Sequence, residues 1–237
     1  GVVPGFGLTN DVWYSATGTN WVMATNQAAW EARYRHTAVT HDGKIWIFGG
    51  IGNGMCPTAT LWDIWNTTDG ANWVCVTNRA PWSRRCDVGA FSYDNKLWVL
   101  GGSDSLCAED WTNDVWSSTD GVTWTQVTPR APWSPRCGFG TVLFSNAMCI
   151  LGGEVELPST DIMKTNDVWY SFNGTNWTRA TARAPWAGRA NFGSVNHSNV
   201  LWIMGGGWAM DAGGDSYTND VWYSSDATNW TQTTKNT

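Results

Sequence analysis

A four-residue segment that recurs five times at nearly constant spacing constrains the fold of this chain more than any other feature. It reads Asn-Asp-Val-Trp in four copies and Trp-Asp-Ile-Trp in one. The copies begin at Asn10, Trp62, Asn113, Asn166 and Asn219, which are 52, 51, 53 and 53 residues apart. A further Trp follows the last residue of every copy by eight positions. This self-similarity predicts a repeat architecture with one structural unit in each period.

Each full period contains four short segments typical of β-strands. In one repeat we expect them at residues 86–93, 96–100, 113–118 and 123–128, with turn residues between them. Residues 97–100 are all apolar, which is typical of an inner strand buried on both faces. Four-stranded units at this period cannot bury their faces alone. They therefore predict an all-β fold, a β-propeller in which neighbouring sheets cover one another.

Composition narrows the classes of partner. Only 14% of the 237 residues are charged, and the formal net charge is −6. Nucleic-acid binding requires clustered Lys and Arg, which are absent, so we expect no such partner. No apolar run reaches the ~20 residues needed to span a bilayer, so no membrane insertion is expected. The N-terminus carries no signal-like segment and is interpreted as a mature or trimmed end.

A pair of glycines ends the second predicted strand of each full repeat. The pairs are Gly49-Gly50, Gly101-Gly102, Gly152-Gly153 and Gly205-Gly206. With the aromatic residue and Trp that follow at fixed positions, the pattern resembles the kelch repeat of propellers such as the central domain of galactose oxidases, over nearly the whole chain. The resemblance implies a fold and no single function, because kelch propellers serve many unrelated roles. The turn at 118–124 resembles a short Asp-box and is interpreted as structural.

The repeats predict four complete blades and a partial one, about five in all, in a single domain. The expected segments are 1–29 for the partial blade and 30–80, 81–131, 132–184 and 185–237 for the complete blades. Residues 10–25 supply only the third and fourth strands of the partial blade, with Val2-Val3 as a candidate stub of its second strand. Either the chain is a piece of a longer propeller, or it is a small ring whose partial blade is tolerated or completed by another chain. We favour the small ring, and unpaired strand edges then predict an interaction there.

The six cysteines include two pairs with the same separation. Cys56 and Cys107 follow a diglycine, and Cys86 and Cys137 begin an inner strand 30 residues later. In a propeller these positions share one face, so we predict the disulfides Cys56–Cys86 and Cys107–Cys137, each worth ~2–4 kcal/mol. Repeated pairs indicate an oxidising compartment, and hence an extracellular or cell-surface location. Cys149 replaces a Trp found in the other repeats and is expected to be a buried free thiol.

Five sequons are candidate N-glycosylation sites, and they become informative only if the protein is secreted and eukaryotic. They lie at Asn66, Asn173, Asn176, Asn196 and Asn229.

A second signature, Trp-x-x-Arg, recurs in the loop that enters each blade. Its members are Trp30 and Arg33, Trp82 and Arg85, Trp133 and Arg136, and Trp186 and Arg189. A ring of this kind can stack on sugars or grip a carboxylate bidentately. Alternatively, the Arg side chains satisfy carbonyls or pair with the Asp of the repeated segment, while the Trp side chains wedge between blades. Strict repetition favours the structural interpretation, because packing obeys symmetry and binding sites usually break it.

The loops between second and third strands break the symmetry. They are acidic and contain Trp111 and Trp208, which we add to the candidate binding residues. Variable loops on a rigid scaffold are where function usually lies. No segment has the ligand spacing of a Ca²⁺ loop, and His36, His41 and His197 form no plausible metal triad. We therefore expect no metal or cofactor.

These observations predict a non-enzymatic protein-interaction or structural scaffold module. Its contacts are expected to run through the loop face and through the incomplete blade, with a protein partner or by self-assembly. The sequence lacks a nucleophile elbow, a P-loop and a dinucleotide-binding loop. The alternative is a lectin that uses exposed Trp and polar loop residues to bind a glycan.

Overall fold

The computed structural model describes residues 2–3, 7–54, 59–104, 111–156, 162–209 and 215–234, and every helix or strand assigned in these ranges is a β-strand. Most strands form four antiparallel sheets, here called blades 1 to 4, each in meander order. Blade 1 comprises β5 (Thr37–His41), β6 (Lys44–Ile51), β7 (Thr60–Thr67) and β8 (Val74–Thr77). Blade 2 comprises β9 (Gly89–Tyr93), β10 (Lys96–Leu100), β11 (Val115–Ser118) and β12 (Thr125–Thr128).

Blades 3 and 4 follow the same plan. Blade 3 comprises β13 (Arg136–Cys137), β14 (Gly140–Phe144), β15 (Ala147–Glu156), β16 (Ile162–Ser171) and β17 (Thr178–Thr181). Blade 4 comprises β18 (Gly193–His197), β19 (Val200–Met204), β22 (Val221–Ser224) and β23 (Thr231–Thr234). A two-stranded extension, β20 (Gly207–Ala209) with β21 (Asp215–Tyr217), continues the middle strands of blade 4 past the diglycine.

The N-terminal unit is a half-blade with only two blade strands, β3 (Val12–Tyr14) and β4 (Val22–Thr25). Before it, β1 (Val2–Val3) pairs with β2 (Gly7–Leu8), with Val2 opposite Leu8. In blade 4, Gly207 lies opposite Tyr217 in the same relation to the repeated Asn. Val2 therefore corresponds to the residue just past the diglycine, which lies in the second strand of blade 1 as Ile51 and of blade 3 as Glu154. That Val2 and Val3 are a stub of the second strand is compatible with this register and stays a prediction.

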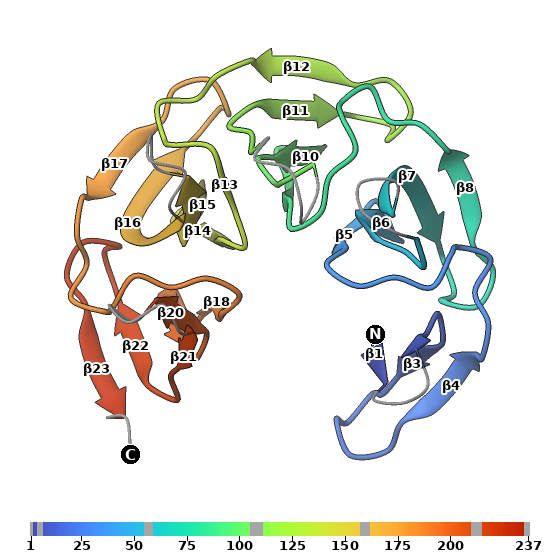
Figure 1. Cartoon of the computed structure of the whole chain (residues 1–237), viewed down its shortest axis with the longest axis horizontal. Coiled ribbons are helices and arrows are strands. Elements are labelled where there is room, and N and C mark those ends of the chain that lie inside the picture. The colour runs from blue at the N-terminus through green and yellow to red at the C-terminus, as the bar shows by residue number, and fades with distance from the viewer. Residues whose placement is uncertain are drawn as a thin grey trace.

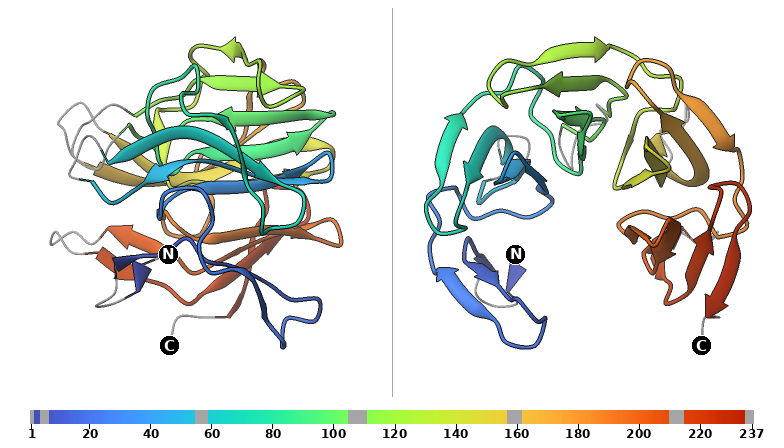
Figure 2. Two further views of the ribbon diagram at one scale, coloured as in Figure 1. Left: turned by 90° about the vertical axis from the view of Figure 1, so that its right-hand side faces the viewer. Right: turned by 180° about the vertical axis from the view of Figure 1, so that it is seen from behind.

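The blades are arranged side by side in an arc around a central axis, with the half-blade and blade 4 at its two ends (Figure 1). The view from behind shows the same open arrangement (Figure 2). The four-stranded blades and the propeller fold are as predicted. The closed small ring is not what the structure shows, because a gap separates the two ends of the arc. None of the residues placed by the structure forms a helix that is both long and apolar enough to cross a bilayer.

The inner strand of blade 2 begins later than the sequence predicted, at Gly89 in place of Cys86. Asp87 has a φ of 51°, which lies in the left-handed region and interrupts the ladder. Cys86 then makes only an isolated bridge with Ser103. Equivalent left-handed residues, two positions after each repeated Arg, are Arg35, Asp87, Gly138 and Asn191.

Each interface between blades is an apolar core in which one face of a blade covers the next. Trp46 and Phe48 of blade 1 pack with Leu97 and Val99 of blade 2. The corresponding contacts recur between blades 2 and 3 and between blades 3 and 4. Burial of these faces is the main source of stability, since no single sheet can cover itself.

The Asp-box-like turn between the third and fourth strands is structural, as interpreted from the sequence. The Ser118 hydroxyl accepts hydrogen bonds from the backbone N–H groups of Asp120 and Gly121. The Asp120 carboxylate accepts two more, from Val122 at 2.8 Å and Thr123 at 2.7 Å. Gly121 has a φ of +72° and lies under the Trp46 indole, so a Cβ there would overlap the ring. Turn and indole thus lock neighbouring blades together.

Candidate functional site: a conserved-geometry frame and a charged channel mouth

The four repeated Arg side chains form ion pairs inside the molecule. Nη1 and Nη2 of Arg136 donate to the two carboxylate oxygens of Asp167, at 2.8 and 2.9 Å, and Nη1 also donates to the carbonyl of Gly152 at 2.8 Å. All four Arg side chains are at most 3% exposed. The pairs are Arg33 with Asp63, Arg85 with Asp114, Arg136 with Asp167, and Arg189 with Asp220. Each pair ties a blade's entry loop to its own third strand.

The pKa values of two of the paired carboxylates, Asp167 and Asp220, show that the hydrogen bonds and charge of Arg outweigh burial. Burial by itself would raise the pKa of Asp167, but the Arg136 hydrogen bonds and charge, with a hydrogen bond from Trp169, lower it overall. For Asp220 the same balance, with Arg189 as the partner, lowers the pKa to about 2. Both groups are therefore ionised at neutral pH, as the bidentate geometry requires.

The four repeated Trp side chains are buried as well. Trp30, Trp82, Trp133 and Trp186 are 1–6% exposed. Each packs edge-on against the Trp of the Asp-box-like turn, as Trp82 does on Trp124 at 4.8 Å between ring centroids. The eight Trp and Arg residues predicted as candidate binding residues are therefore buried, so they do not form the exposed ring that a ligand site requires, and the structural interpretation agrees with their contacts. The lectin alternative loses the stacking platform on which it depended.

The remaining two candidate Trp residues lie at the loop face. Trp111 is half-buried and its backbone bridges that of Ser103. Trp208 lies in β20, and its side chain is outside the described residues. A binding role for either stays a prediction.

A charged cluster that the sequence did not predict lies where the entry loop of blade 1 meets the residues that follow the diglycines of blades 3 and 4, here called the channel mouth. Arg35 of blade 1 pairs with Asp87 of blade 2 at 3.0 Å, and Lys164 pairs with Glu154 within blade 3 at 3.7 Å. A cavity of about 290 Å³ opens beside them. Its polar lining comprises Arg35, Glu154, Lys164, Asn191, Tyr217 and Thr218. Because blades 1, 3 and 4 all contribute, the cavity lies at the axis around which the blades are arranged.

The repeat position two residues after each Arg could have identified this cluster. It holds Arg35, Asp87, Gly138 and Asn191, four different residues within an otherwise constant frame. Backbone hydrogen bonds link these four residues in two pairs across blades. The Asp87 N–H donates to the Arg35 carbonyl at 3.0 Å, and the Asn191 N–H donates to the Gly138 carbonyl at 2.8 Å. These four residues, here called the inner ring, therefore have a fixed backbone geometry and variable side chains. Such an arrangement suits selective recognition of a ligand.

Asp87 is the most perturbed carboxyl group of the channel. Burial raises its pKa to about 6; Arg35 opposes this shift and Glu154 adds to it. The ion pair with Arg35 at 3.0 Å by itself would lower the pKa of Asp87, whereas burial raises it, and the effect of burial is the larger. The cluster offers both hydrogen-bond donors and charged acceptors, so it can hold a polar ligand that carries both.

The cysteines do not support the predicted disulfides. Cys86 and Cys137 are buried free thiols, while their predicted partners Cys56 and Cys107 lie outside the described residues. The pairing therefore stays a prediction. Burial raises the pKa of the Cys86 thiol to about 12. Cys149 is buried and free, as expected.

The structure contradicts one of the five candidate glycosylation sites. Asn66 lies in β7 and is 9% exposed, which leaves no room for a glycan. The other four Asn residues are exposed, and glycosylation there stays a prediction; they are Asn173, Asn176, Asn196 and Asn229.

The structure places no three side chains of His, Cys, Asp or Glu close enough to hold a metal ion within the ranges that it describes. Of the His residues, His41 has a hydrogen bond between its Nδ1 and the Ser92 hydroxyl at 2.8 Å. His36 is half-buried beside Arg33, and its desolvation and the Arg33 charge together lower its pKa to about 4. His36 is therefore neutral near pH 7.

The two ends of the arc expose faces that are covered elsewhere. Met204 of blade 4 is 41% exposed, whereas Leu100 and Leu151 at the same repeat position are fully buried. On the half-blade, Trp21 is 60% exposed, whereas its equivalent Trp230 is 9% exposed. These faces are apolar because they are built to cover, and be covered by, another blade.

Comparisons with known proteins agree with this architecture. The chain resembles the solved structure titled "Structure of YjhT" with a TM-score of 0.73 at 16% identity, over 92% of this chain and 75% of that one. It is 27% identical over 218 residues to the "Leucine-zipper-like transcriptional regulator 1 homolog" of Drosophila melanogaster, covering 85% of this chain but only 21% of that relative's length. A sequence profile described as the KLHDC2/KLHL20/DRC7 Kelch-repeats domain matches residues 4–207. The chain therefore belongs to the Kelch-repeats domain family.

Proposed function

We propose that this chain is a protein-interaction scaffold, without a reaction of its own, that binds a partner at the channel mouth on its loop face. One observation supports the proposal most strongly. Beside a frame of four equivalent ion pairs, two of the variable residues, Arg35 and Asn191, line a charged cavity. Symmetry is kept where the fold needs it and lost where a specific ligand would be recognised.

The chemistry of the cavity favours a polar peptide segment as the ligand. Arg35 and Lys164 supply cationic donors, while Glu154 supplies a carboxylate, and Tyr217 stands at the rim with its ring 81% exposed. A peptide presents carbonyls, N–H groups and charges of both signs, and it can match this set. Aromatic rings at an interface rim add contact area at low entropic cost.

Binding is best tested with peptides selected from a random display library and measured by fluorescence anisotropy. Tyr217→Ala and Asn191→Gly change the lining of the cavity and leave all four Arg–Asp ion pairs in place. We expect each to weaken the selected peptides about tenfold or more, as truncation of an interface residue does. Tyr14→Ala, at an exposed ring of the half-blade, is the matched control and should bind as the wild type does. Peptides that bind all variants equally would overturn the proposal.

We further propose that the exposed ends of the arc contact another polypeptide. The support is the exposure of Met204 and Trp21, whose equivalents are buried between blades. Changing both to polar residues should abolish any concentration-dependent association seen by sedimentation. An extracellular location stays part of this proposal, and mass measurement with and without reductant tests the two disulfides on which it depends.

A further inference from the structure

One of the three complete interfaces between blades departs from the pattern of the other two. Trp46 covers Gly121 between blades 1 and 2, and Trp98 covers Gly174 between blades 2 and 3. Between blades 3 and 4 the Trp position is Cys149 and the Gly position is Ala227. Both members of the pair are changed together, and the indole is missing.

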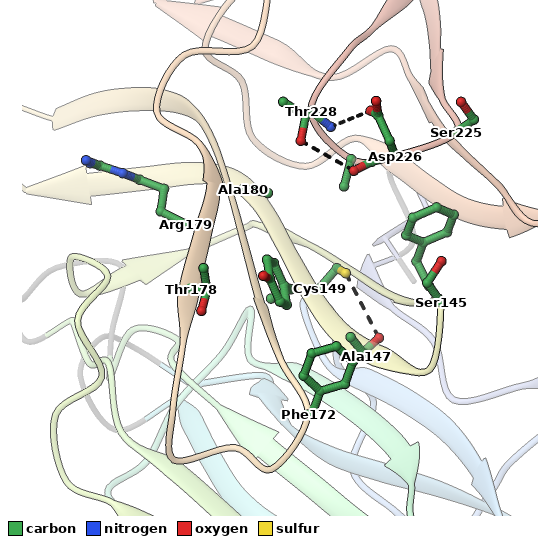
Figure 3. A pocket seen from close by; sticks show the side chains of 13 residues that line it. Ser145, Ala147, Cys149, Phe172, Thr178, Arg179, Ala180, Ser225, Asp226 and Thr228 are labelled. Atoms are coloured by element: carbon green, nitrogen blue, oxygen red, sulfur yellow. Dashed lines mark hydrogen bonds between the residues drawn. The ribbon is translucent and has the colours of Figure 1, made fainter.

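A cavity of about 590 Å³ lies at this interface, within the size range of ligand sites. Its walls come from both blades, as Figure 3 shows, with Phe172 and Cys149 on one side and Asp226 and Thr228 on the other. It opens beside Ala147, the first residue of β15, whereas the channel mouth lies near the other end of that strand. The two sites are therefore separate.

The part of the lining that blade 3 supplies includes two aromatic rings near Cys149. Tyr170 lies opposite Cys149 in the sheet, and its ring meets Phe172 edge-on at 5.7 Å. Burial raises the pKa of the Cys149 thiol to about 12, so that this wall is neutral at any physiological pH. Asp226 at the rim is occupied, because its carboxylate accepts backbone hydrogen bonds from Thr228 and Asn229.

An acceptor for an indole N–H is also in place. In the sister interfaces, Nε1 of Trp46 donates to the carbonyl of His41 at 3.2 Å, and Nε1 of Trp98 donates to that of Tyr93 at 2.9 Å. The residue at the same repeat position in blade 3 is Phe144, which lines the cavity. Its carbonyl corresponds to the acceptor used by the two internal indoles.

We propose that this cavity between blades 3 and 4, here called the slot, binds the indole side chain of a Trp residue from a partner protein. The incoming ring would occupy the space that Trp46 and Trp98 fill in the sister interfaces. Its faces and edges would meet the rings of Tyr170 and Phe172, and its N–H would donate to the Phe144 carbonyl. This site is independent of the channel mouth, so failure of either proposal leaves the other intact.

The probe is N-acetyl-L-tryptophanamide, titrated against the full chain by ligand-observed NMR. We expect a Kd of roughly 0.1–1 mM for a ligand of this size. N-acetyl-L-leucinamide is the matched ligand control and should bind at least tenfold more weakly. The absence of binding by the Trp probe at several millimolar would overturn the proposal. Binding of free indole without binding of the probe would do so too, because a side chain must enter attached to its backbone.

A variant that fills the slot with its own indole ring tests the proposal most directly. Cys149→Trp together with Ala227→Gly restores the sister pair, and the neighbouring rings of Trp202 and Tyr223 at 5.2 Å show that a Trp fits opposite a Tyr. This double variant should lose at least tenfold in affinity for the probe while keeping a wild-type circular dichroism spectrum. If it fails to fold, Phe172→Ala, which removes a 58%-exposed wall, should weaken binding several-fold. Unchanged affinity in a folded slot variant would refute the site.

Discussion

The replacement Arg136→Met tests whether the internal ion pairs hold the blades in place. The substitution removes both hydrogen bonds to Asp167 and leaves the Gly152 carbonyl without its donor, in a side-chain position that is 1% exposed. Breaking a buried pair by removing one partner costs about 3–5 kcal/mol, because the remaining charge is buried without compensation. Arg130→Met changes an exposed Arg of the same entry loop and should cost at most about 0.5 kcal/mol.

The loss should depend on pH in a defined direction. In the wild type the pKa of Asp167 is lowered on folding, so its contribution to stability is present above the unfolded pKa of about 4 and is lost as the pH falls through the folded value. Without Arg136, burial dominates and raises the pKa of Asp167. The variant then suffers most near pH 7 and recovers as the carboxyl becomes protonated. The difference in unfolding free energy between the two proteins should therefore shrink between pH 7 and pH 4.

Urea unfolding followed by circular dichroism measures both effects. The double variant Arg136→Met/Asp167→Leu removes both charges and should recover most of the lost stability, since an apolar pair of similar volume is often as stable as a buried ion pair. If Arg136→Met unfolds within about 1 kcal/mol of Arg130→Met, the reasoning is wrong. A loss that is the same at pH 7 and pH 4 would show that it comes from packing and not from the uncompensated buried charge of Asp167.

Three further predictions follow from the packing, the channel and the thiols. Gly121→Ala should destabilise the fold by about 2–4 kcal/mol because the new Cβ overlaps Trp46, whereas Gly18→Ala, at a similar φ with open space, should cost only the ~1 kcal/mol of backbone strain; urea unfolding of both variants compares them. Asp87→Asn should be more stable than the wild type at pH 7, because burial raises the folded pKa to about 6, and the advantage should disappear below pH 4, as thermal unfolding across this range would reveal. Among the four thiols that the structure describes, only Cys75 should react with iodoacetamide in the native state, and peptide mass mapping would contradict this if a buried thiol reacted equally fast.

The sequence was sufficient to predict the blades because each period carries its own turns, strands and diglycine. The strands of blade 2 end where the pattern places them, and the structural roles of the Asp-box-like turn and of the repeated Arg are confirmed. Repetition was the signal throughout. A residue that recurs in every unit serves the contacts that every unit makes.

What the sequence did not predict arises between units or departs from the repeat. The channel mouth joins residues from blades that are distant in the chain, so neither Arg35 nor Lys164 marks a site by itself. The late start of β9 follows from the left-handed backbone of Asp87, which the apolar pattern does not reveal. Asn66 is buried by the folded structure, and a sequon pattern carries no information on burial.

The altered interface between blades 3 and 4 also records an order of events. If the blades descend from one duplicated unit, their ancestor carried Trp and Gly at the two facing positions. A methyl group at the Gly position overlaps the indole, as Gly121 and Gly174 show, so Ala227 was tolerated only after the Trp had been lost. The substitution that produced Cys149 was therefore the permissive step.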